Sequence, residues 1–407
     1  MDPIRNPYAP GAGQRPPELA GRAEQLAAFD VVLERVSRGR PERSIVLVGL
    51  RGVGKTVLLN AMRSAAVRAG WGTGKLEARP EQRLRRPLSA ALHQALRELG
   101  HPSADGVEHV LGVVKTFAQR EVGPRARLRD RWQPGIDAPA VAGRADSGDI
   151  EIDLVELLTD VGGLAGDTGR GVAIFIDEMQ DLGTDDVSAL CAAAHEISQA
   201  RLPVIVVGAG LPHLPSLLSA SKSYSERLFR YSRIDRLDVE AASLALSAPA
   251  REEGAQWSAD ALAAMYDATA GYPYFIQAYG KAVWDQAPGS PITVQDVRAG
   301  APEAEAELGV GFFGSRYERA TPAEREYLRA MADAAGGDGP AYRSSLSVEL
   351  DSVPTALVAT VLERKPQSLS PARDALLKKG LIYSAERGRI AFTVPHFGRY
   401  LRSHSPE

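Results

Sequence analysis

The feature that most constrains this chain is a glycine-rich turn that joins an apolar run to a helical pattern. The run Ile45–Val48 is short and rich in β-branched residues, as buried parallel strands are. It ends at Gly49, and the residues up to Gly54-Lys55-Thr56 fit the spacing G-x-x-x-x-G-K-T before a helical pattern opens at Val57. A strand before and a helix after are the context that this motif requires. A glycine-rich turn without function is therefore disfavoured, and the sequence predicts a phosphate-binding loop.

Each residue type in this loop has a chemical reason. Glycines let the backbone N–H groups turn toward phosphate oxygens, which a Cβ would obstruct. The positive end of the following helix favours the same anion. Lys55 can reach the β- and γ-phosphates, and Thr56 offers a hydroxyl to Mg²⁺. We therefore expect a nucleoside triphosphate and Mg²⁺ as cofactors, with the phosphates held by Gly49, Leu50, Arg51, Gly52, Val53, Gly54, Lys55, Thr56 and Val57.

A second informative stretch lies at residues 172–182, where an apolar strand pattern ends in Asp177-Glu178. Alone this is a weak signal, since an ordinary strand end can look the same. About 120 residues after a phosphate loop it is strong, because phosphoryl chemistry needs both a metal ligand and a group that activates water. We expect Asp177 to hold Mg²⁺, directly or through water. We expect Glu178 to orient and deprotonate the water that attacks the γ-phosphate.

The composition is that of a globular protein and excludes some functions. The chain has 407 residues, of which 44% are hydrophobic and 24% charged, enough for two or three domains with a sizeable core. A formal net charge of −3 argues against a protein that coats nucleic acid with its whole surface, although a locally basic module stays open. The single cysteine, Cys191, excludes an internal disulfide and a cysteine-cluster zinc site. The absence of a signal peptide and of any run of about 18 apolar residues predicts a cytoplasmic protein without a membrane partner.

Strand and helix patterns alternate over residues 19–237 and predict a doubly wound α/β sheet of the P-loop NTPase type. Besides the two strands above, the runs at 73–78, 203–210 and 234–237 fit strands. Residues 1–18, rich in proline and glycine, are predicted to be an extended N-terminal arm.

Residues 101–150 show no clear period and are predicted to be an insertion in this domain. They contain a basic run of four arginines at alternate positions. A solvated insertion is the favoured interpretation, and contact with nucleic acid is the alternative. The four residues are Arg125, Arg127, Arg129 and Arg131.

Beyond residue 237 the strand signal fades, and residues 238–310 are predicted to form a helical lid. The sequence pattern changes again over residues 315–407. Thr321, followed by Pro322 and Glu324, forms a well-capped helix start. Two more helices are expected at 357–362 and 370–379, and a hairpin at 381–394. Three helices and a hairpin predict a winged helix-turn-helix domain, whose third helix would enter a major groove.

The C-terminal segment 315–407 has 14 Lys and Arg against 11 Asp and Glu, a weakly basic balance. Double-stranded DNA is therefore a candidate partner. Winged helices also dock on proteins, and these charges could simply form a solvated face. The candidate DNA-facing residues are Arg364, Lys365, Ser368, Ser370, Arg373, Lys378, Lys379, Arg387 and Arg389.

With these motifs in place, residues 18–402 resemble AAA+ ATPases of the origin-recognition and initiator type, in particular bacterial ATP-binding relatives with a P-loop domain, a lid and a C-terminal winged helix. The phosphate loop and Asp177-Glu178 carry the resemblance. Glu18-Leu19-Ala20-Gly21-Arg22 is similar to the family's adenine-side motif. The resemblance implies ATP and ADP as ligands, with Gly21 and Arg22 near the adenine. A plain surface turn is the alternative for that segment.

In this family an arginine just before the last core strand reaches the γ-phosphate of a neighbouring subunit. Arg227 holds that kind of position, and Arg230 is the second choice. The resemblance therefore implies Arg227 as a catalytic residue beside Lys55 and Glu178. It also implies a homo-oligomer during turnover, because a cation supplied in trans stabilises transition-state charge. The alternative is a surface arginine paired with Glu226 or Asp235.

Two departures from the family pattern matter. The strand at 203–210 ends in Gly208-Ala209-Gly210, without the polar residue that usually senses the γ-phosphate, and His213 fits a surface turn better than that role. The lid motif Gly271-Tyr272-Pro273 has no arginine. It is similar instead to the Gly-x-Pro motif of STAND signalling ATPases, in which the proline, here Pro273, packs near the nucleotide. Both departures favour a slow switch over fast turnover.

The sequence therefore predicts a slow, Mg²⁺-dependent ATPase whose nucleotide state controls oligomerisation and the binding of a winged helix to DNA. The alternative is a STAND-like signalling ATPase whose winged helix docks on a protein. Its lid motif supports that alternative, and the lack of an internal repeat counts against it. A catalytically silent scaffold is disfavoured, since it has no need of Glu178.

Overall fold

The structure is a computed structural model and describes residues 1–11, 13–99, 104–120, 135–335, 352–386, 388–394 and 396–403. The chain forms two compact units. The core unit comprises Arg22–Gly49 and Lys55–Ile234, and the lid unit comprises Met1–Gly21, Leu50–Gly54 and Asp235–Glu407. The basic run of the predicted insertion and one candidate DNA-facing residue lie outside the described residues; these are Arg125, Arg127, Arg129, Arg131 and Arg387.

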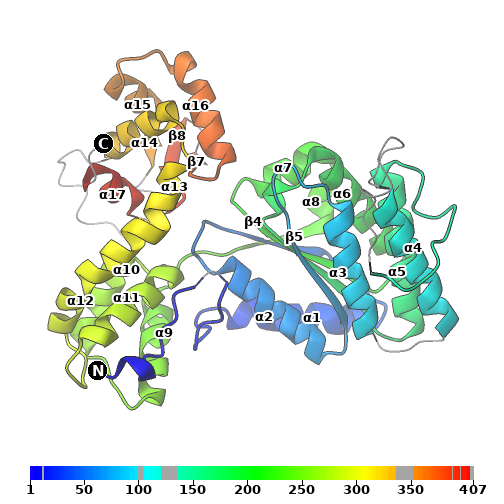
Figure 1. Cartoon of the computed structure of the whole chain (residues 1–407), viewed down its shortest axis with the longest axis horizontal. Helices are drawn as coiled ribbons and strands as arrows, with labels where there is room; N and C mark the ends of the chain where they lie inside the picture. Colours follow the sequence, from blue (N-terminus) through cyan, green and yellow to red (C-terminus); the bar gives the residue numbers. More distant parts are fainter. Residues whose placement is uncertain are drawn as a thin grey trace. The chain divides into compact units, whose positions relative to one another are not determined.

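A five-stranded sheet forms the centre of the core unit (Figure 1). All of its strand pairs are parallel, and the strands stand in the order β2-β3-β4-β1-β5. They are β1 (Ser44–Val48), β2 (Gly72–Glu77), β3 (Val172–Asp177), β4 (Val204–Gly210) and β5 (Phe229–Arg233).

The last strand is not at 234–237, where the sequence predicted it. In β5, Phe229 lies opposite Ser44 and Arg233 lies opposite Val48. The next amide, that of Ile234, donates to the Val48 carbonyl over 2.8 Å as the strand ends. β5 pairs with one neighbour at the edge of the sheet, where exposed arginines are tolerated and discourage further pairing. An apolar pattern is therefore a poor guide to this strand.

Different helices cover the two faces of the sheet, which confirms the doubly wound α/β prediction (Figure 1). On one face, Phe175 of β3 meets Phe29 edge to face, with ring centroids 6.2 Å apart. On the other, Ile174 and Ile176 join a large apolar cluster, because alternate residues of a strand point to opposite faces. The first face carries α1 (Ala23–Ser37) and α2 (Lys55–Arg68), and the second carries α3 (Arg85–Glu98), α5 (Ile150–Asp167) and α6 (Thr184–Gln199).

The predicted insertion contains a helix that the sequence analysis missed. Helix α4 (Ala104–Gln119) packs on α3 and α5. Its buried positions follow the i, i+3, i+4, i+7 spacing of an amphipathic helix, so the signal was present. Polar and glycine-rich neighbours within residues 101–150 obscured it. The buried side chains are Val110, Val113, Val114 and Phe117.

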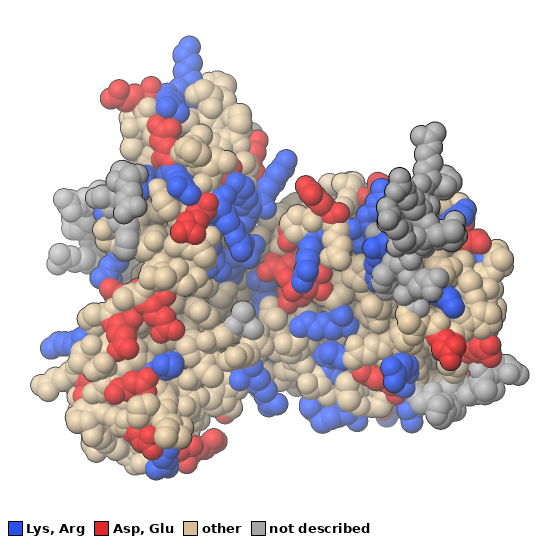
Figure 2. Space-filling view, in the orientation of Figure 1, with Lys and Arg blue, Asp and Glu red and all other residues tan. Residues whose placement is uncertain are grey.

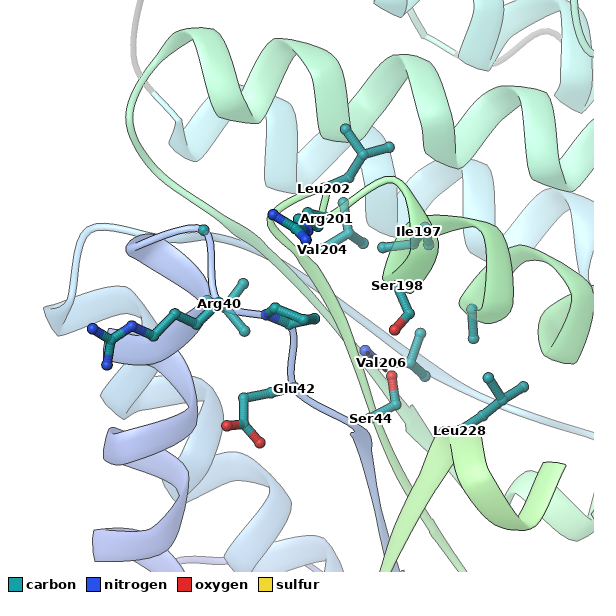
Figure 3. Close-up of a pocket in the computed structure, with 14 residues that line it drawn as sticks. Arg40, Glu42, Ser44, Ile197, Ser198, Arg201, Leu202, Val204, Val206 and Leu228 are labelled. Carbon is teal, nitrogen blue, oxygen red and sulfur yellow. Dashed lines mark hydrogen bonds between the residues drawn. The ribbon is translucent and has the colours of Figure 1, made fainter. Parts of the chain in front are cut away.

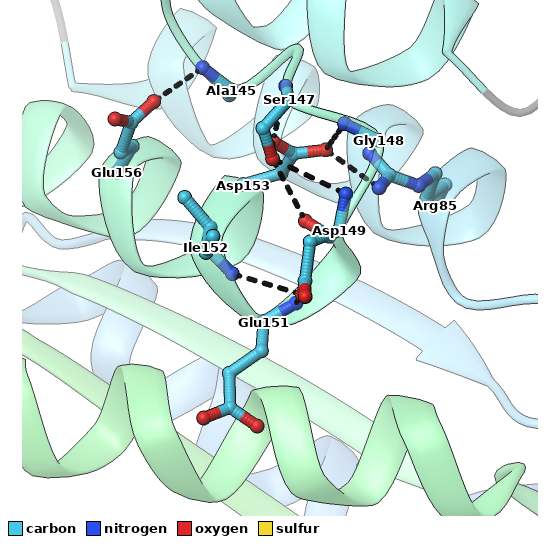
Figure 4. A network of polar contacts seen from close by, with 9 residues as sticks. All are labelled: Arg85, Ala145, Ser147, Gly148, Asp149, Glu151, Ile152, Asp153 and Glu156. Carbon is cyan, nitrogen blue, oxygen red and sulfur yellow. Dashed lines mark hydrogen bonds and ion pairs between the residues drawn. The ribbon is translucent and has the colours of Figure 1, made fainter.

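A buried polar network holds this insertion on the core (Figure 4). Arg85 Nη2 of α3 lies 2.6 Å from Asp153 Oδ2 of α5, and the two side chains are 7% and 0% exposed. Ser147 donates to Asp153 Oδ1 through its amide (2.8 Å) and its hydroxyl (2.7 Å). Asp149 accepts from the Glu151 amide at 2.8 Å and caps α5. The Arg85 guanidinium also lies 4.7 Å from the centre of the Phe117 ring, which joins α4 to the network.

In the lid unit, the N-terminal arm is docked on helices. Residues Pro3–Arg5 form a 3₁₀ turn rather than a purely extended segment. Tyr8 is 3% exposed; its hydroxyl donates to the Leu246 carbonyl (2.6 Å) and accepts from Trp257 Nε1 (2.8 Å). The predicted lid is helical, and its elements are α9 (Val239–Glu252), α10 (Ala259–Thr269), α11 (Pro273–Gln286) and α12 (Val294–Glu307).

The lid continues into the C-terminal segment without leaving helical conformation. A π-helical stretch, η4 (Leu308–Gly314), follows α12 directly and leads into α13 (Ser315–Glu318). The boundary expected between residues 310 and 315 thus falls inside this run.

The remaining elements match the predicted helices and hairpin closely. α14 (Pro322–Ala335) starts with a capping box, in which the Thr321 amide donates to Glu324 Oε2 (2.8 Å) and the Glu324 amide donates to Thr321 Oγ1 (3.4 Å). The next elements are β6 (Val353–Pro354), α15 (Thr355–Val361), α16 (Pro366–Lys378), β7 (Ile382–Glu386), β8 (Arg389–Phe392) and α17 (Phe397–Ser403). β6 was not predicted; it pairs with β8 in a three-stranded antiparallel sheet. In the described part of the chain, no helix is both long and apolar enough to cross a bilayer.

Asp153→Ala is expected to lower the free energy of unfolding by about 3–5 kcal/mol, because it leaves the buried Arg85 cation without its counter-ion. Urea denaturation followed by circular dichroism measures this. Glu34→Gln is the control: it breaks an exposed pair with Arg38 and should cost less than about 1 kcal/mol. Equal losses in the two variants would contradict the assigned role of the network.

At acid pH, the free energy of unfolding should depend on the Asp153 carboxylate. Burial opposes the charged form of Asp153, but hydrogen bonds from Ser147 and Arg85 outweigh it and hold the pKa below its usual value. A lowered pKa contributes stability at neutral pH that is lost as pH falls through the folded-state pKa. Asp153→Asn should therefore flatten the acid limb of the stability profile.

Candidate functional site

The sheet topology brings the ends of three strands to one edge of the core unit. β4 pairs with β1 on one side, where Val48 lies opposite Gly210, and with β3 on the other, where Ile176 lies opposite Gly208. The Gly49 amide extends the first pairing by donating to the Gly210 carbonyl over 3.2 Å. Since β4 separates them, the ends of β1 and β3 are two strand spacings, or about 10 Å, apart. The predicted phosphate loop and the Asp177-Glu178 pair therefore leave the sheet at the same edge.

The candidate phosphate loop has the backbone that its glycines predict. Gly52 and Gly54 have φ of 82° and 89°, a region that a side chain disfavours. Lys55 opens α2 and is only 8% exposed, and its Nζ donates to the Gly49 carbonyl over 2.9 Å. Thr56 follows in the first helical turn and is half-buried. A buried ammonium and a helix N-terminus behind a glycine turn suit a phosphate chain.

At the end of β3, Asp177 is 6% exposed, and its Oδ1 accepts a 3.0 Å hydrogen bond from the Glu178 amide. Glu178 is half-buried and has a φ of 50°, the left-handed region that few non-glycine residues adopt. Such backbone strain is frequent at functional sites. The turn η3 (Met179–Asp181) follows directly. Two carboxylates of different burial thus stand side by side at the edge of the sheet.

These residues fit Mg²⁺ bound together with a nucleotide. Among the described residues, no group of three or more His, Cys, Asp or Glu side chains could enclose a metal ion. Mg²⁺ does not need such a cage, because it is usually held by one or two carboxylates together with phosphates and water. Asp177 and Thr56 are the candidate protein ligands for this mode.

The sequence analysis missed Gln180. Its Nε2 donates to Glu178 Oε2 over 2.6 Å, and its Oε1 accepts from the Leu211 amide over 3.1 Å. Two features of the sequence could have indicated it. A glutamine follows Glu178 by two positions, and the strand at 203–210 ends in Gly-Ala-Gly without a polar side chain. His213, the other polar residue near that strand end, is exposed at the start of α7 (Leu214–Ser221).

Arg227 lies in the short helix α8 (Ser225–Leu228), immediately before β5. Its side chain is exposed, as is that of Arg230 within the strand. Across the described residues, neither arginine forms an ion pair, so the predicted alternative of pairing with Glu226 or Asp235 is not observed.

Two of the predicted residues, Pro273 and Gly21, lie in the lid unit. Pro273 is the first residue of α11, and a Cβ added to Gly54 would meet its ring at 4.0 Å. The next amide, that of Tyr274, donates to the Gly52 carbonyl over 3.4 Å. Gly21 has a φ of 68° and lies against the start of α9, where an added Cβ would be 3.0 Å from Ala241 Cβ. Arg22, at the start of α1 in the core unit, is 7% exposed.

A surface pocket lies at the opposite edge of the sheet from the phosphate loop (Figure 3). Ser44 at the start of β1 and Val204 at the start of β4 line it, together with Arg40 and Arg201. It is therefore separate from the candidate nucleotide site.

Cys191 is not a candidate nucleophile. It is fully buried in α6, and burial raises the pKa of its thiol to about 11.

The fold and the loop together define a P-loop AAA+ NTPase fold. Residues 18–207 match the family model of the AAA ATPase domain, and residues 310–401 match a model described as a domain of unknown function. No curated protein matches the sequence significantly.

Three solved structures are similar to this chain. A Walker-type ATPase of Pyrococcus abyssi superposes with a TM-score of 0.56 at 16% identity, over 95% of this chain and 97% of that one. Cdc6p of Pyrobaculum aerophilum has a TM-score of 0.44 at 16% identity, covering 99% and 97%. The RuvB Holliday junction branch migration motor of Thermotoga maritima has a TM-score of 0.44 at 17% identity, covering 97% and 100%. At 16% identity, the similarity to the first of these structures concerns the fold alone.

Lys55→Ala should weaken ATP binding roughly 10- to 100-fold, because a charge-assisted contact to phosphate is lost. Titration with a fluorescent ATP analogue measures the dissociation constant. Lys75→Ala is the matched control, since Lys75 donates to Asn60 from edge strand β2. If both variants bind like the parent protein, the loop is not the phosphate site.

Proposed function

We propose that this protein binds ATP with Mg²⁺, hydrolyses it slowly, and uses the nucleotide state as a switch. The observation that carries the proposal is the shared sheet edge, where a glycine loop and the buried Lys55 follow β1 while Asp177 and Glu178 follow β3. An ordinary structural turn needs neither a buried ammonium nor a buried carboxylate at a strand end.

Each residue has a distinct task in this proposal. The loop amides and Lys55 hold the phosphates and neutralise charge that grows on them during cleavage. Thr56 and Asp177 hold the metal ion, which supplies further stabilisation of that charge when bound. Glu178, half-buried beside Asp177, orients the attacking water and takes its proton.

We further propose that a second copy of the chain completes the site. Arg227 stands exposed at the end of α8, before edge strand β5, and the described residues offer it no carboxylate. A free cation in this position can stabilise phosphate charge in a neighbouring molecule. Turnover would then depend on assembly, and Arg230 is the second choice for the same role.

Contacts within the lid unit support a route from the nucleotide to the C-terminal segment. Tyr274, whose amide contacts the phosphate loop, stacks on Phe312 of η4 with ring centroids 4.8 Å apart. The next residue, Phe313, stacks on Phe397 (5.9 Å) and Tyr400 (5.2 Å) of α17. Any shift of α11 that accompanies nucleotide binding would therefore press on the C-terminal helix, because packed aromatic rings transmit displacement.

DNA binding by the C-terminal segment is the first candidate for the function that the nucleotide state controls. The order α14, β6, α15, α16, β7, β8 supports a winged helix, with α16 as the helix that would enter the groove. Lys365 and Lys378 are exposed at its two ends, and Ser368 is exposed between them. On the face drawn in Figure 2, basic and acidic side chains are interspersed, so binding would rest on local contacts.

Docking on a protein partner is the second candidate, and specific contacts favour it. Several of the predicted DNA-facing cations already have partners: Arg364 pairs with Glu326 (3.0 Å), Arg373 with Asp374 (3.0 Å), Lys379 with Glu324 (2.6 Å), and Arg389 Nε donates to Ser352 Oγ (2.9 Å). Ser370 is half-buried and bonded to the Pro366 carbonyl. Leu357 and Val361, one turn apart on α15, are 41% and 42% exposed. Exposed apolar residues suit a protein surface better than a phosphate backbone.

Glu178→Gln should keep ATP affinity and lose most hydrolysis, since the amide keeps the shape but cannot accept the water's proton. Phosphate release and analogue binding are measured on the same preparation. Glu42→Gln, away from the site, is the control and should behave like the parent protein. Normal hydrolysis by Glu178→Gln would show that another group is the base.

If α16 contacts DNA, Lys365→Ala with Lys378→Ala should weaken duplex binding for every sequence and lower the salt slope by about two. Arg364→Ala should have a smaller effect, because Glu326 already neutralises that charge. Mobility-shift assays with ATP and with ADP, alongside mass by light scattering and turnover with and without duplex, test this. No duplex affinity in either nucleotide state would leave protein docking as the output.

A further inference from the structure

Gln180 connects the carboxylate of Glu178 to the end of β4. Its side-chain amide donates to Glu178 Oε2 at 2.6 Å and accepts from the Leu211 backbone amide at 3.1 Å. The two partners fix which way the amide points. A carboxylate can only accept and a backbone N–H can only donate, so the NH₂ group must face Glu178 and the oxygen must face Leu211.

Packing at the end of β4 makes room for this side chain. A Cβ added to Gly210 would lie 2.8 Å from Gln180 Oε1 and 2.6 Å from Leu214 Cδ2, and one added to Gly208 would overlap the Met179 sulfur. Met179 is fully buried, which anchors the turn on the strand. The glycines of β4 are therefore required by the neighbouring turn, and the polar atoms at this strand end come from Gln180.

Glu178 is held at both its backbone and its side chain. The left-handed backbone of Glu178, stabilised by the 3.0 Å bond from its amide to Asp177 Oδ1, turns the residue away from the line of β3. The Gln180 amide then fixes one carboxylate oxygen. A general base works best when its orientation is set before the reacting water arrives.

We propose that Gln180 is a positioning residue for hydrolysis: its NH₂ group orients Glu178 from the end of β4, the strand that separates the phosphate loop from the Asp177-Glu178 pair. This rests on the proposed function, since it assigns Glu178 as the base. Gln180 acts through Glu178 and need not touch the nucleotide. Loss of Gln180 should therefore slow hydrolysis without loosening nucleotide binding.

The test uses the full-length protein and four variants. Gln180→Ala should lower kcat roughly 10- to 100-fold and leave the dissociation constant for a non-hydrolysable ATP analogue unchanged, because the lost bond is one to a charged group. Gln180→Glu keeps an acceptor for the Leu211 amide but places a second carboxylate against Glu178, so it should lose at least as much activity. Gln94→Ala is the matched control, since Gln94 forms an exposed 3.1 Å bond with Glu98. Glu178→Gln tests whether Glu178 is the general base.

The outcomes separate this inference from the proposed function. If the parent protein turns over ATP and Glu178→Gln does not, but Gln180→Ala matches the control in kcat, the inference alone is wrong. If Gln180→Glu is active while Gln180→Ala is not, the side chain only tethers the turn to Leu211, which also overturns it. If Gln180→Ala loses analogue binding as Lys55→Ala does, its role is structural. If the parent protein does not hydrolyse ATP, or Glu178→Gln hydrolyses it normally, the proposed function fails first.

Discussion

The position of β4 between β1 and β3 is the constraint on which the core unit depends. Parallel pairing on both sides of β4 carries the phosphate loop and the Asp177-Glu178 pair to one edge, about two strand spacings apart. If β1 and β3 were adjacent strands, the carboxylates would instead lie about one strand spacing from the loop. The location of the candidate site therefore follows from strand order. Its chemistry depends on the side chains at the strand ends.

Close packing at the end of β4 is the next consequence. Gly208 and Gly210 leave space that Met179 and Gln180 fill from the neighbouring turn. A strand that lacks polar side chains at its end can thus still present polar atoms there, supplied by a residue that follows β3. Gly208 admits the buried thioether of Met179, and Gly210 admits the oriented amide of Gln180.

Within the lid unit, helices and aromatic rings pack beside residues 50–54 of the candidate phosphate loop. The first turn of α11 contacts Gly52 and Gly54, and rings of α11, η4 and α17 stack in succession. In η4, the adjacent Phe312 and Phe313 both contact Phe275 of α11. Phe312 also stacks on Tyr274, and Phe313 stacks on Phe397 and Tyr400. Such irregular helical turns are frequent at functional positions.

The sequence by itself determined the glycine-rich turn between β1 and α2, the acidic strand end, most of the helices and the parallel α/β class, because glycine spacing, capping residues and apolar period act over a few residues. Only the tertiary structure decided the position of β5, since an edge strand is defined by its pairing with β1 rather than by apolar content. The burial of Tyr8 and of the Arg85–Asp153 pair, and the bridge from Gln180 to Glu178, were likewise beyond sequence reasoning. Each of these depends on residues that are distant in sequence or on a turn conformation that only packing fixes, so no local pattern encodes it.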